Sequence, residues 1–401
     1  MTMSSREIHV VVVGISTAGI GVARKVAALA TNGFPNLRVT IIDKNAYTYH
    51  SIGAPRGIVD KEFGRSLFFR LDTLLTEFEA SAKPKHRFIQ ALLTNVNKET
   101  IELSTGETLE FDYLVLATGA ENTFPGNVNA RTLEDGRAKL ARLYENVQAA
   151  DNVLVIGGGA VGVEIAGEIA DEYPNKRVTL VHSASRLLPL NFKEGISNGA
   201  VHKLRRLGVE VVLNERINIP ADIQFDGAVR PTTLVGRSGR EYTSDIQFLA
   251  TGTKVRSEYM ATLEQHLGTS LREKNGTIKV KPTLQLATNA LSNIFVAGDV
   301  NSLPGGAKYA VKAGEQAQLV AANLITMINC DTKSAKPVLQ NWDGSVMNMI
   351  AVPIGKSLGV LQASGIAFGK SCVGDIVVSR VKAKDYFVSK RAKEFPPNAN
   401  A

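Results

Sequence analysis

The sequence predicts an α/β protein in which parallel strands alternate with helices, arranged as two similar units followed by a small α+β part. Three observations predict this class. A strand, a glycine-rich turn and a helix follow one another after residue 9 and again after residue 152. Each unit is followed by an apolar strand that ends in Ala-Thr-Gly, at residues 117–119 and 250–252. A third apolar strand ends in Ala297-Gly298-Asp299 before a helical pattern. Strands linked through helices form parallel sheets.

Length and composition agree with this class. The 401 residues are enough for two or three domains, and 44% of them are hydrophobic. The two cysteines, Cys330 and Cys372, are far apart, which argues against a disulfide framework or a metal site and indicates a reducing compartment. Neither a secretory signal nor a window of about 18 apolar residues is found, so we expect a cytoplasmic protein that is not secreted.

The net charge of +8 favours anionic partners, namely phosphate-bearing cofactors, acidic lipid surfaces or nucleic acid. Basic runs are too short to single out nucleic acid, which we do not expect as a partner. The plain alternative is a basic surface on a soluble enzyme.

The first unit begins with a strand over residues 9–13 and a helical pattern over residues 19–30. Its turn reads Gly14, Ile15, Ser16, Thr17, Ala18 and Gly19, with serine in place of the middle glycine of G-x-G-x-x-G. The next strand ends at Asp43. In such a unit the turn and the helix N-terminus face a pyrophosphate, and the acid accepts hydrogen bonds from a ribose.

The second unit repeats this plan after a strand predicted at residues 152–156, with a complete fingerprint in which Gly157, Gly159 and Gly162 occupy the three glycine positions. Its strand after the helix, residues 177–181, ends at His182. One fingerprint alone is weak evidence, but two in the same strand–turn–helix context predict two Rossmann-like dinucleotide-binding domains. Thr118, Gly119 and Gly252 would form small turns that bring backbone close to a cofactor.

These motifs resemble the two-dinucleotide-binding-domain flavoproteins of glutathione-reductase-like fold, which include the type-II NADH dehydrogenases. Within that group the chain most resembles the AIF-like and ferroptosis-suppressor proteins, which reduce quinones with NAD(P)H. The similarity is carried by residues 49–56, 157–183 and 384–389. It implies FAD in the first unit and NADPH or NADH in the second. The implied domains are 1–125 with 286–332 for FAD, 126–285 for NAD(P)H, and 333–401 as an α+β domain.

The resemblance also implies roles for single residues. The turn from Gly14 to Gly19 would hold the FAD pyrophosphate, with serine as a tolerated variant at its middle position. Asp43 would hold the adenosine ribose, and Asp299 the ribityl chain unless it only caps a helix. The remaining FAD contacts implied are Arg56 at the pyrophosphate or flavin, the backbone of Leu93 at the adenine, and Lys308 at the isoalloxazine unless it is a solvated surface lysine.

In the second unit, the resemblance places Glu164 near flavin and nicotinamide, although an acid in a first helical turn also complements the helix dipole. An NADH-specific unit normally carries Asp or Glu where this chain has His182. With Ser183 and Arg186 nearby, this position favours NADPH or dual use, because no carboxylate repels a 2′-phosphate.

Residues 46–57 contain no cysteine pair, so electrons must leave the flavin directly for an external acceptor, which the resemblance implies is a quinone. Strands are predicted at residues 346–353 and 375–379. A basic cluster suggests peripheral membrane contact at a mitochondrion or lipid droplet, or simply a solvated helix; it comprises Lys382, Lys384, Lys390, Arg391 and Lys393. Thr2 excludes N-myristoylation.

Three other functions stay open: a biosynthetic flavoprotein that reduces a specialised small molecule, an electron donor to an iron–sulfur protein, and an AIF-like cell-death effector that binds DNA. The sequence does not predict the oligomeric state.

Overall fold

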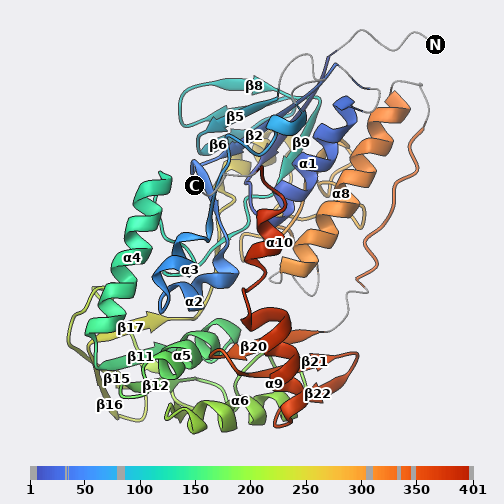
Figure 1. The fold of residues 1–401 in the computed structure, drawn as a ribbon. Helices are drawn as coiled ribbons and strands as arrows, with labels where there is room; N and C mark the ends of the chain where they lie inside the picture. Colours follow the sequence, from blue (N-terminus) through green and yellow to red (C-terminus); the bar gives the residue numbers. More distant parts are fainter. Residues whose placement is uncertain are drawn as a thin grey trace.

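The computed structural model describes residues 7–31, 34, 36–78, 86–303, 310–331, 336–344 and 349–396 (Figure 1). Its first unit is a five-stranded parallel sheet in the order β19-β9-β1-β2-β5. These strands are β1 (Ile8–Val13), β2 (Leu37–Asp43), β5 (Arg87–Gln90), β9 (Tyr113–Leu116) and β19 (Ile294–Val296). Strand β1 reads IHVVVV and is buried from His9 onward, as expected for a central strand covered on both faces.

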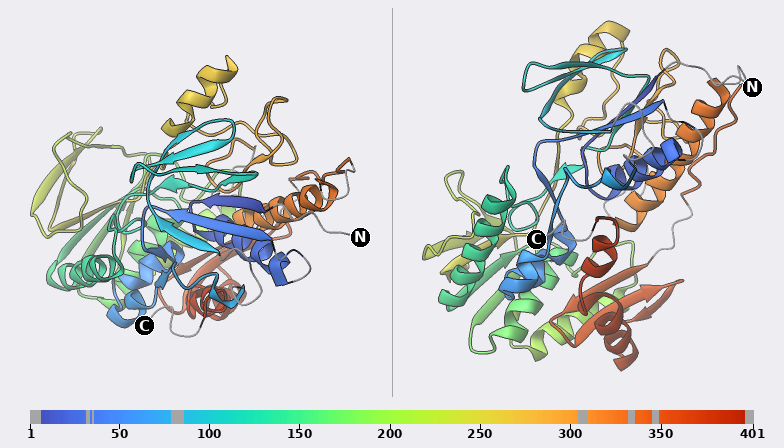
Figure 2. Two further views of the ribbon diagram at one scale, coloured as in Figure 1. Left: turned by 90° about the horizontal axis from the view of Figure 1, so that it is seen from above. Right: turned by 45° about the horizontal axis from the view of Figure 1, so that its top comes forward.

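Different elements cover the two faces of this sheet. On one face α1 (Thr17–Thr31) and α8 (Ala310–Asp331) lie side by side (Figure 1). Their approach is close, because a Cβ at Gly21 would lie 2.8 Å from the Cβ of Ala317. On the other face lie α7 (Ala261–Leu267) and an antiparallel meander (Figure 2), which consists of β6 (Leu93–Val96), β7 (Thr100–Leu103) and β8 (Thr108–Glu110).

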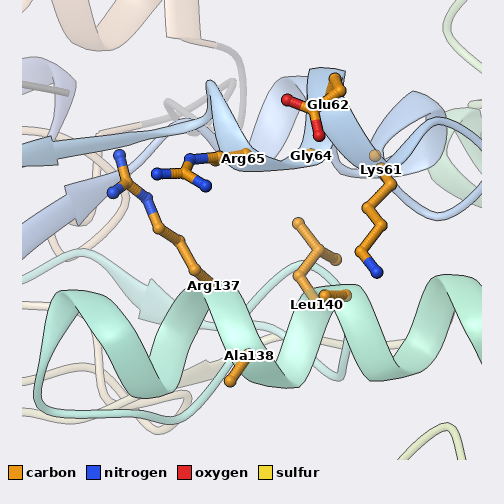
Figure 3. A pocket seen from close by; sticks show the side chains of 9 residues that line it. Lys61, Glu62, Gly64, Arg65, Arg137, Ala138 and Leu140 are labelled. Atoms are coloured by element: carbon orange, nitrogen blue, oxygen red, sulfur yellow. The ribbon is translucent and has the colours of Figure 1, made fainter. Parts of the chain in front are cut away.

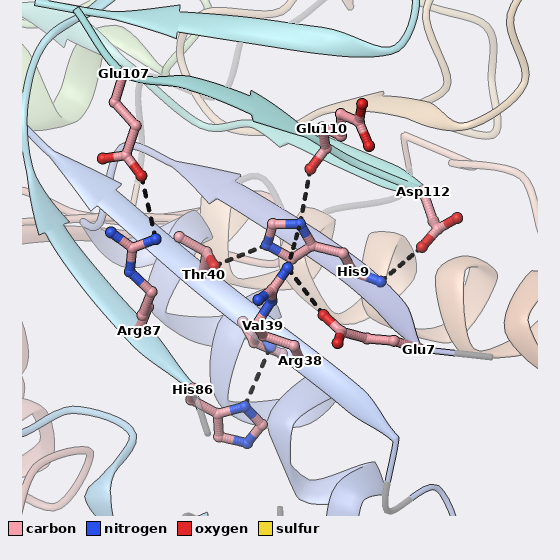
Figure 4. Close-up of polar contacts among 10 residues, drawn as sticks. All are labelled: Glu7, His9, Arg38, Val39, Thr40, His86, Arg87, Glu107, Glu110 and Asp112. Atoms are coloured by element: carbon pink, nitrogen blue, oxygen red, sulfur yellow. Dashed lines mark hydrogen bonds and ion pairs between the residues drawn. The ribbon is translucent and has the colours of Figure 1, made fainter. Parts of the chain in front are cut away.

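The amino-terminal edge of the sheet carries a buried polar network (Figure 4). The ring of His9 bonds through Nε2 to the Thr40 hydroxyl at 2.8 Å, and through Nδ1 to the Glu110 carbonyl at 2.7 Å. Its backbone N–H donates to the Asp112 carboxylate at 2.7 Å. Burial, reinforced by the charge of Arg38, lowers the pKa of His9 to about 4. The imidazole is therefore neutral in the folded protein at pH 7.

The second unit repeats the parallel plan with four strands in the order β13-β12-β11-β17. They are β11 (Asn152–Ile156), β12 (Arg177–Val181), β13 (Glu210–Val212) and β17 (Ile246–Leu249). Helices of this unit are α4 (Leu133–Ala149), α5 (Ala160–Glu172) and α6 (Glu194–Arg206); its meander is β14 (Ile217–Asn218), β15 (Thr232–Gly236) and β16 (Glu241–Ser244). The predicted α/β class with two Rossmann-like units is confirmed.

Two short strands carry the chain from one unit to the other. Strand β10 (Ala120–Glu121) pairs antiparallel with β18 (Lys254–Val255), so the outgoing and returning connections lie side by side. Beyond β18, the side chains of Met260, Leu263 and Ile278 enter the apolar core of the first unit. We therefore propose that the inserted unit ends near residue 253 and not at the expected residue 285.

The remaining strands and helices fall into two groups. Near the start of the chain are β3 (Tyr47–Tyr49), β4 (Phe68–Arg70), α2 (Ala54–Gly57), α3 (Lys61–Arg65) and the 3-10 turns Ser51–Gly53 and Thr76–Phe78. A third 3-10 turn, Glu258–Met260, lies outside both groups and precedes α7. Near its end are β20 (Ile350–Ile354), β21 (Leu358–Ala363), β22 (Ile366–Phe368), α9 (Cys372–Val378), the π-helical turn Ser379–Ala383 and α10 (Val388–Ala392).

The strand predicted at residues 375–379 is wrong, because this stretch lies in α9 and the following turn. The Ser371 hydroxyl caps α9 by accepting from the N–H of Gly374. Asp375 forms an ion pair with the buried Lys203 at 2.6 Å and accepts from the N–H of Gly359 at 2.8 Å. These contacts fix a helix despite the β-branched residues. Strand β20 matches the other predicted strand, whose residues 346–348 lie outside the described part of the chain.

Candidate cofactor and active site

The first glycine-rich turn keeps glycine at the two positions where its backbone requires it. Gly14 has a φ of +89°, and a Cβ there would lie 2.4 Å from the carbonyl oxygen of Ala117. A Cβ at Gly19 would lie 2.0 Å from the carbonyl oxygen of Gly14. Ser16, at the middle position, is exposed. Serine therefore leaves the turn intact, and its hydroxyl is a donor that suits a phosphate oxygen.

Asp43 ties the end of β2 to this turn. One of its carboxylate oxygens accepts from the N–H of Ile15 at 2.8 Å, and the other accepts from the N–H of Asn45 at 2.9 Å. Burial raises the pKa of Asp43, while these two hydrogen bonds oppose the shift. A carboxylate held in this way has further lone pairs, which fits an acceptor for ribose hydroxyls.

The second turn has the same construction with a complete fingerprint. Gly157 has a φ of +119°, with the carbonyl oxygen of Ala250 2.5 Å from any added Cβ, and a Cβ at Gly162 would lie 1.9 Å from the carbonyl oxygen of Gly157. At Gly159, in contrast, no described heavy atom lies within 4 Å of the added Cβ. The outer glycines therefore serve the fold, and the middle one leaves space for a bound nucleotide.

His182 takes the place in the second unit that Asp43 takes in the first. Its Nδ1 accepts from the N–H of Gly158 at 3.0 Å, just as Asp43 accepts from the residue after Gly14. Burial lowers the pKa of His182, so the imidazole puts no charge at this strand end at neutral pH. Ser183 is exposed, and the Arg186 guanidinium donates to the Leu190 carbonyl at 2.6 Å.

Most of the other predicted cofactor contacts belong to the first unit, and Gly252 belongs to the second. Gly119, Gly252 and Gly298 follow the ends of β9, β17 and β19 and have φ values of +67°, +72° and +79°, so each of these turns contains a left-handed glycine. The Thr118 hydroxyl bonds to the Tyr259 hydroxyl at 2.7 Å. Leu93 is buried at the start of β6, and Asp299 follows β19 in a half-buried position. Lys308 lies outside the described residues.

Arg56 makes a contact that the sequence analysis did not anticipate. Its guanidinium forms a two-pronged ion pair with Glu168 of α5, with N–O distances of 2.5 and 2.9 Å. The side chains are only 8% and 1% exposed. The Tyr386 hydroxyl donates to the same carboxylate at 2.7 Å, and the Tyr386 carbonyl accepts from His50 Nε2 at 2.7 Å. Three distant parts of the chain thus meet at Glu168.

Glu164 lies one turn earlier on α5 and pairs with Lys382. The ammonium is 2.6 Å from the carboxylate and also donates to the Ala351 carbonyl at 3.1 Å. Burial raises the pKa of Glu164, and the positive charge of Lys382 opposes that shift. This charged contact, two residues after Gly162 of the nucleotide turn, therefore joins the second unit to the residues after α9.

The residues from 379 to 396, hereafter the C-terminal segment, then reach the first unit, and α10 lies between the two units in Figure 1 and in the right view of Figure 2. Arg391 donates to the hydroxyl of Thr17 at 2.7 Å. Two members of the predicted basic cluster, Lys382 and Arg391, therefore point inward. Lys384, Lys390 and Lys393 are exposed.

A separate cavity of about 190 Å³ lies between α3 and α4 (Figure 3). Arg65 and Arg137 both line it, and the charge of Arg65 adds to burial in lowering the pKa of Arg137. Neither glycine-rich turn lines this cavity.

In the described part of the chain no three His, Cys, Asp or Glu side chains gather as metal ligands would, and no helix has both the length and the apolar character needed to cross a bilayer.

Two parallel-sheet units, each with a dinucleotide turn, define an oxidoreductase with one site for a flavin and one for a nicotinamide nucleotide. The chain belongs to the pyridine nucleotide-disulphide oxidoreductase family, whose model matches residues 8–317. It is an oxidoreductase with FAD and NAD(P)H as its cofactors.

Individual relatives are similar to most or all of the chain. Ferroptosis suppressor protein 1 of Homo sapiens is 28% identical over 404 residues, which cover 99% of each chain. The FAD-dependent oxidoreductase FVFD30 of Flammulina velutipes is 31% identical over 307 residues, covering 75% of this chain and 88% of that protein. Among solved structures, the sulfide:quinone oxidoreductase of Aquifex aeolicus superposes with a TM-score of 0.70 at 18% identity, covering 97% of this chain and 93% of that one.

Proposed function

We propose that the protein passes two electrons from NAD(P)H through FAD to a quinone-type acceptor. The observation that carries the proposal is the place of the two cysteines. Cys330 lies near the end of α8, and the exposed Cys372 begins α9, whereas residues 46–57, after the first ribose acid, contain none. A dithiol relay is therefore absent from the sequence, and the flavin must serve an external acceptor directly. The resemblance to quinone-reducing flavoproteins supports a quinone in that role.

When bound, FAD supplies the chemistry, because it takes a hydride from the nicotinamide and yields two electrons to the acceptor. We propose that Gly14 to Gly19 bind its pyrophosphate and that Asp43 binds its adenosine ribose. Gly157 to Gly162 would receive the pyrophosphate of NAD(P)H. Glu164 would orient the nicotinamide, with Lys382 balancing its charge in a site from which most water is excluded.

The test is an anaerobic stopped-flow record of flavin absorbance near ~450 nm after mixing with NADPH or with NADH. Bleaching by a nicotinamide nucleotide, followed by recovery on addition of a short-chain quinone, is the expected result. Recovery only with an iron–sulfur protein, or only with a specialised non-quinone substrate, would replace the quinone proposal by one of the other reductases. Salt-sensitive DNA binding by a protein that no nucleotide reduces would indicate a death effector instead.

We further propose NADPH or dual use, because His182 leaves the ribose position without a negative charge. His182→Asp would keep an acceptor for the Gly158 N–H and add a charge that repels a 2′-phosphate. We expect the KM for NADPH to rise about tenfold or more, because the new carboxylate would repel the 2′-phosphate, while the KM for NADH changes little. Equal effects on both nucleotides would refute this assignment of His182.

The cytoplasmic location stays a prediction, as does a peripheral membrane contact. The exposed Lys384, Lys390 and Lys393 are the described residues of the C-terminal segment that support such a contact.

A further inference from the structure

Arg391 brings a buried positive charge to the first dinucleotide turn from the far end of the chain. Its side chain is 8% exposed. One terminal nitrogen donates to the Thr17 hydroxyl at 2.7 Å, and the other pairs with Glu394 at 2.6 Å. Thr17 is both the fourth residue of the Gly14–Gly19 turn and the first residue of α1. The guanidinium therefore lies where the turn meets the helix N-terminus.

The positive charge at this position favours the binding of an anion. The N-terminus of α1 carries the positive end of the helix dipole and N–H groups without helical partners. A buried cation beside it is unfavourable unless negative charge is also present. Glu394 is 39% exposed, so solvent weakens the compensation it gives, and Thr17 contributes only a neutral hydroxyl. A pyrophosphate on the turn would complete the balance, because a guanidinium fork matches phosphate oxygens.

Arg56, the arginine expected in this role, lies at Glu168 of α5, to which its Nε and one terminal nitrogen are bonded. We propose that Arg391 binds the pyrophosphate of FAD and thereby makes the C-terminal segment part of the cofactor site. The inference rests on FAD as the cofactor of the first unit. It does not depend on the electron acceptor.

Packing on both sides holds Arg391 at the turn. Phe395 stacks on Phe69 of β4, with ring centroids 5.0 Å apart and planes 20° from parallel. On the other side of α10, the Tyr386 hydroxyl is bonded to Glu168. A guanidinium that is already positioned loses less side-chain freedom when it binds its ligand, which favours tight retention of the cofactor.

The experiment measures FAD release from the purified holoenzyme. After serial dilution, the recovery of flavin fluorescence gives the dissociation constant without any electron acceptor. We expect Arg391→Gln to raise this constant about 10- to 100-fold, the range for one lost charge-assisted contact to a phosphate. Arg391→Lys keeps the charge but loses the fork, so it should fall between the two. Increasing salt should weaken FAD binding more in the wild type than in Arg391→Gln.

Two controls separate a ligand contact from a structural one. Lys390→Gln removes an exposed charge from the neighbouring position and should leave the dissociation constant unchanged. Glu394→Gln breaks the same ion pair but keeps the cation, so FAD should bind at least as tightly as in the wild type. Retention of FAD by Arg391→Gln at the wild-type level would overturn the proposal. So would equal losses in Arg391→Gln and Glu394→Gln, which would mean that only the ion pair matters.

Discussion

Replacing Glu168 by glutamine should destabilise the protein far more than the same change on the surface of the same helix. The carboxylate is 1% exposed and accepts three hydrogen bonds, two from Arg56 and one from Tyr386. Glutamine has nearly the same shape but no charge. It would leave the Arg56 guanidinium buried without a counter-charge and turn an N–H₂ group toward one of its donors.

The size of the effect follows from this burial. Breaking a buried ion pair by removing one partner costs about 3–5 kcal/mol, because the remaining charge stays out of water. Glu172 offers the matched control, since it lies on α5 four residues later and pairs with Lys356 while both side chains are more than 30% exposed. Glu172→Gln should therefore cost less than about 1 kcal/mol.

Urea unfolding followed by far-UV circular dichroism measures both free energies. A triple variant adds the reverse test: Arg56→Met, Glu168→Met and Tyr386→Phe together remove every polar group of the contact. Because an apolar replacement of similar volume needs no desolvation of charge, this variant should recover most of the loss. The reasoning fails if Glu168→Gln costs no more than Glu172→Gln, or if the triple variant is less stable than the single one.

Two other predictions concern pH and the second turn. In the folded protein His9 stays neutral down to its pKa of about 4, whereas in the unfolded chain it binds a proton below pH ~6.5. The contribution of neutral His9 to stability is therefore complete above pH ~6.5 and is lost on acidification. Between these two values the free energy of unfolding falls by about 1.4 kcal/mol per pH unit. His50, whose pKa burial also lowers to about 4, adds an equal slope, so His9→Gln should remove about half of the loss that urea titrations at pH 7 and pH 5 attribute to the two histidines. Gly159→Ala should leave stability within about 0.5 kcal/mol, because its Cβ enters open space, yet raise the KM for the nicotinamide nucleotide. Gly157→Ala should destabilise the fold itself by more than about 1 kcal/mol, and the assignment of the middle glycine to the ligand is wrong if the two variants behave alike.

The sequence was most informative where local rules act. The strand at Asn152–Ile156 and the strand at Arg177–Val181 were predicted to the residue, because apolar periodicity and a neighbouring glycine turn define them locally. The same rules placed a strand at residues 375–379, where β-branched residues in fact lie in a helix that is fixed by Lys203 and Gly359. Those partners are more than 15 residues away in sequence, and no local pattern predicts the contacts with them.

Long-range contacts likewise separate the predicted site from the observed one. Glu164 was selected through the family resemblance, but its partner Lys382 lies 218 residues later and was assigned to a basic cluster near the end of the chain. Glu168 and Tyr386 lie within the stretches 157–183 and 384–389 that carry the family resemblance, but neither was given a role, because nothing in those stretches shows that the two side chains meet.

The paired connections β10 and β18 have a consequence for how the chain folds. Strand β19 must find β9 across 177 intervening residues, from Leu116 to Ile294, and an unstructured loop of that length closes slowly. The pairing of Glu121 with Lys254 brings the two ends of the inserted unit together. Once that unit has formed, the loop-closure entropy for pairing β9 with β19 is that of two short connections. We therefore expect the second sheet to assemble before the first is complete.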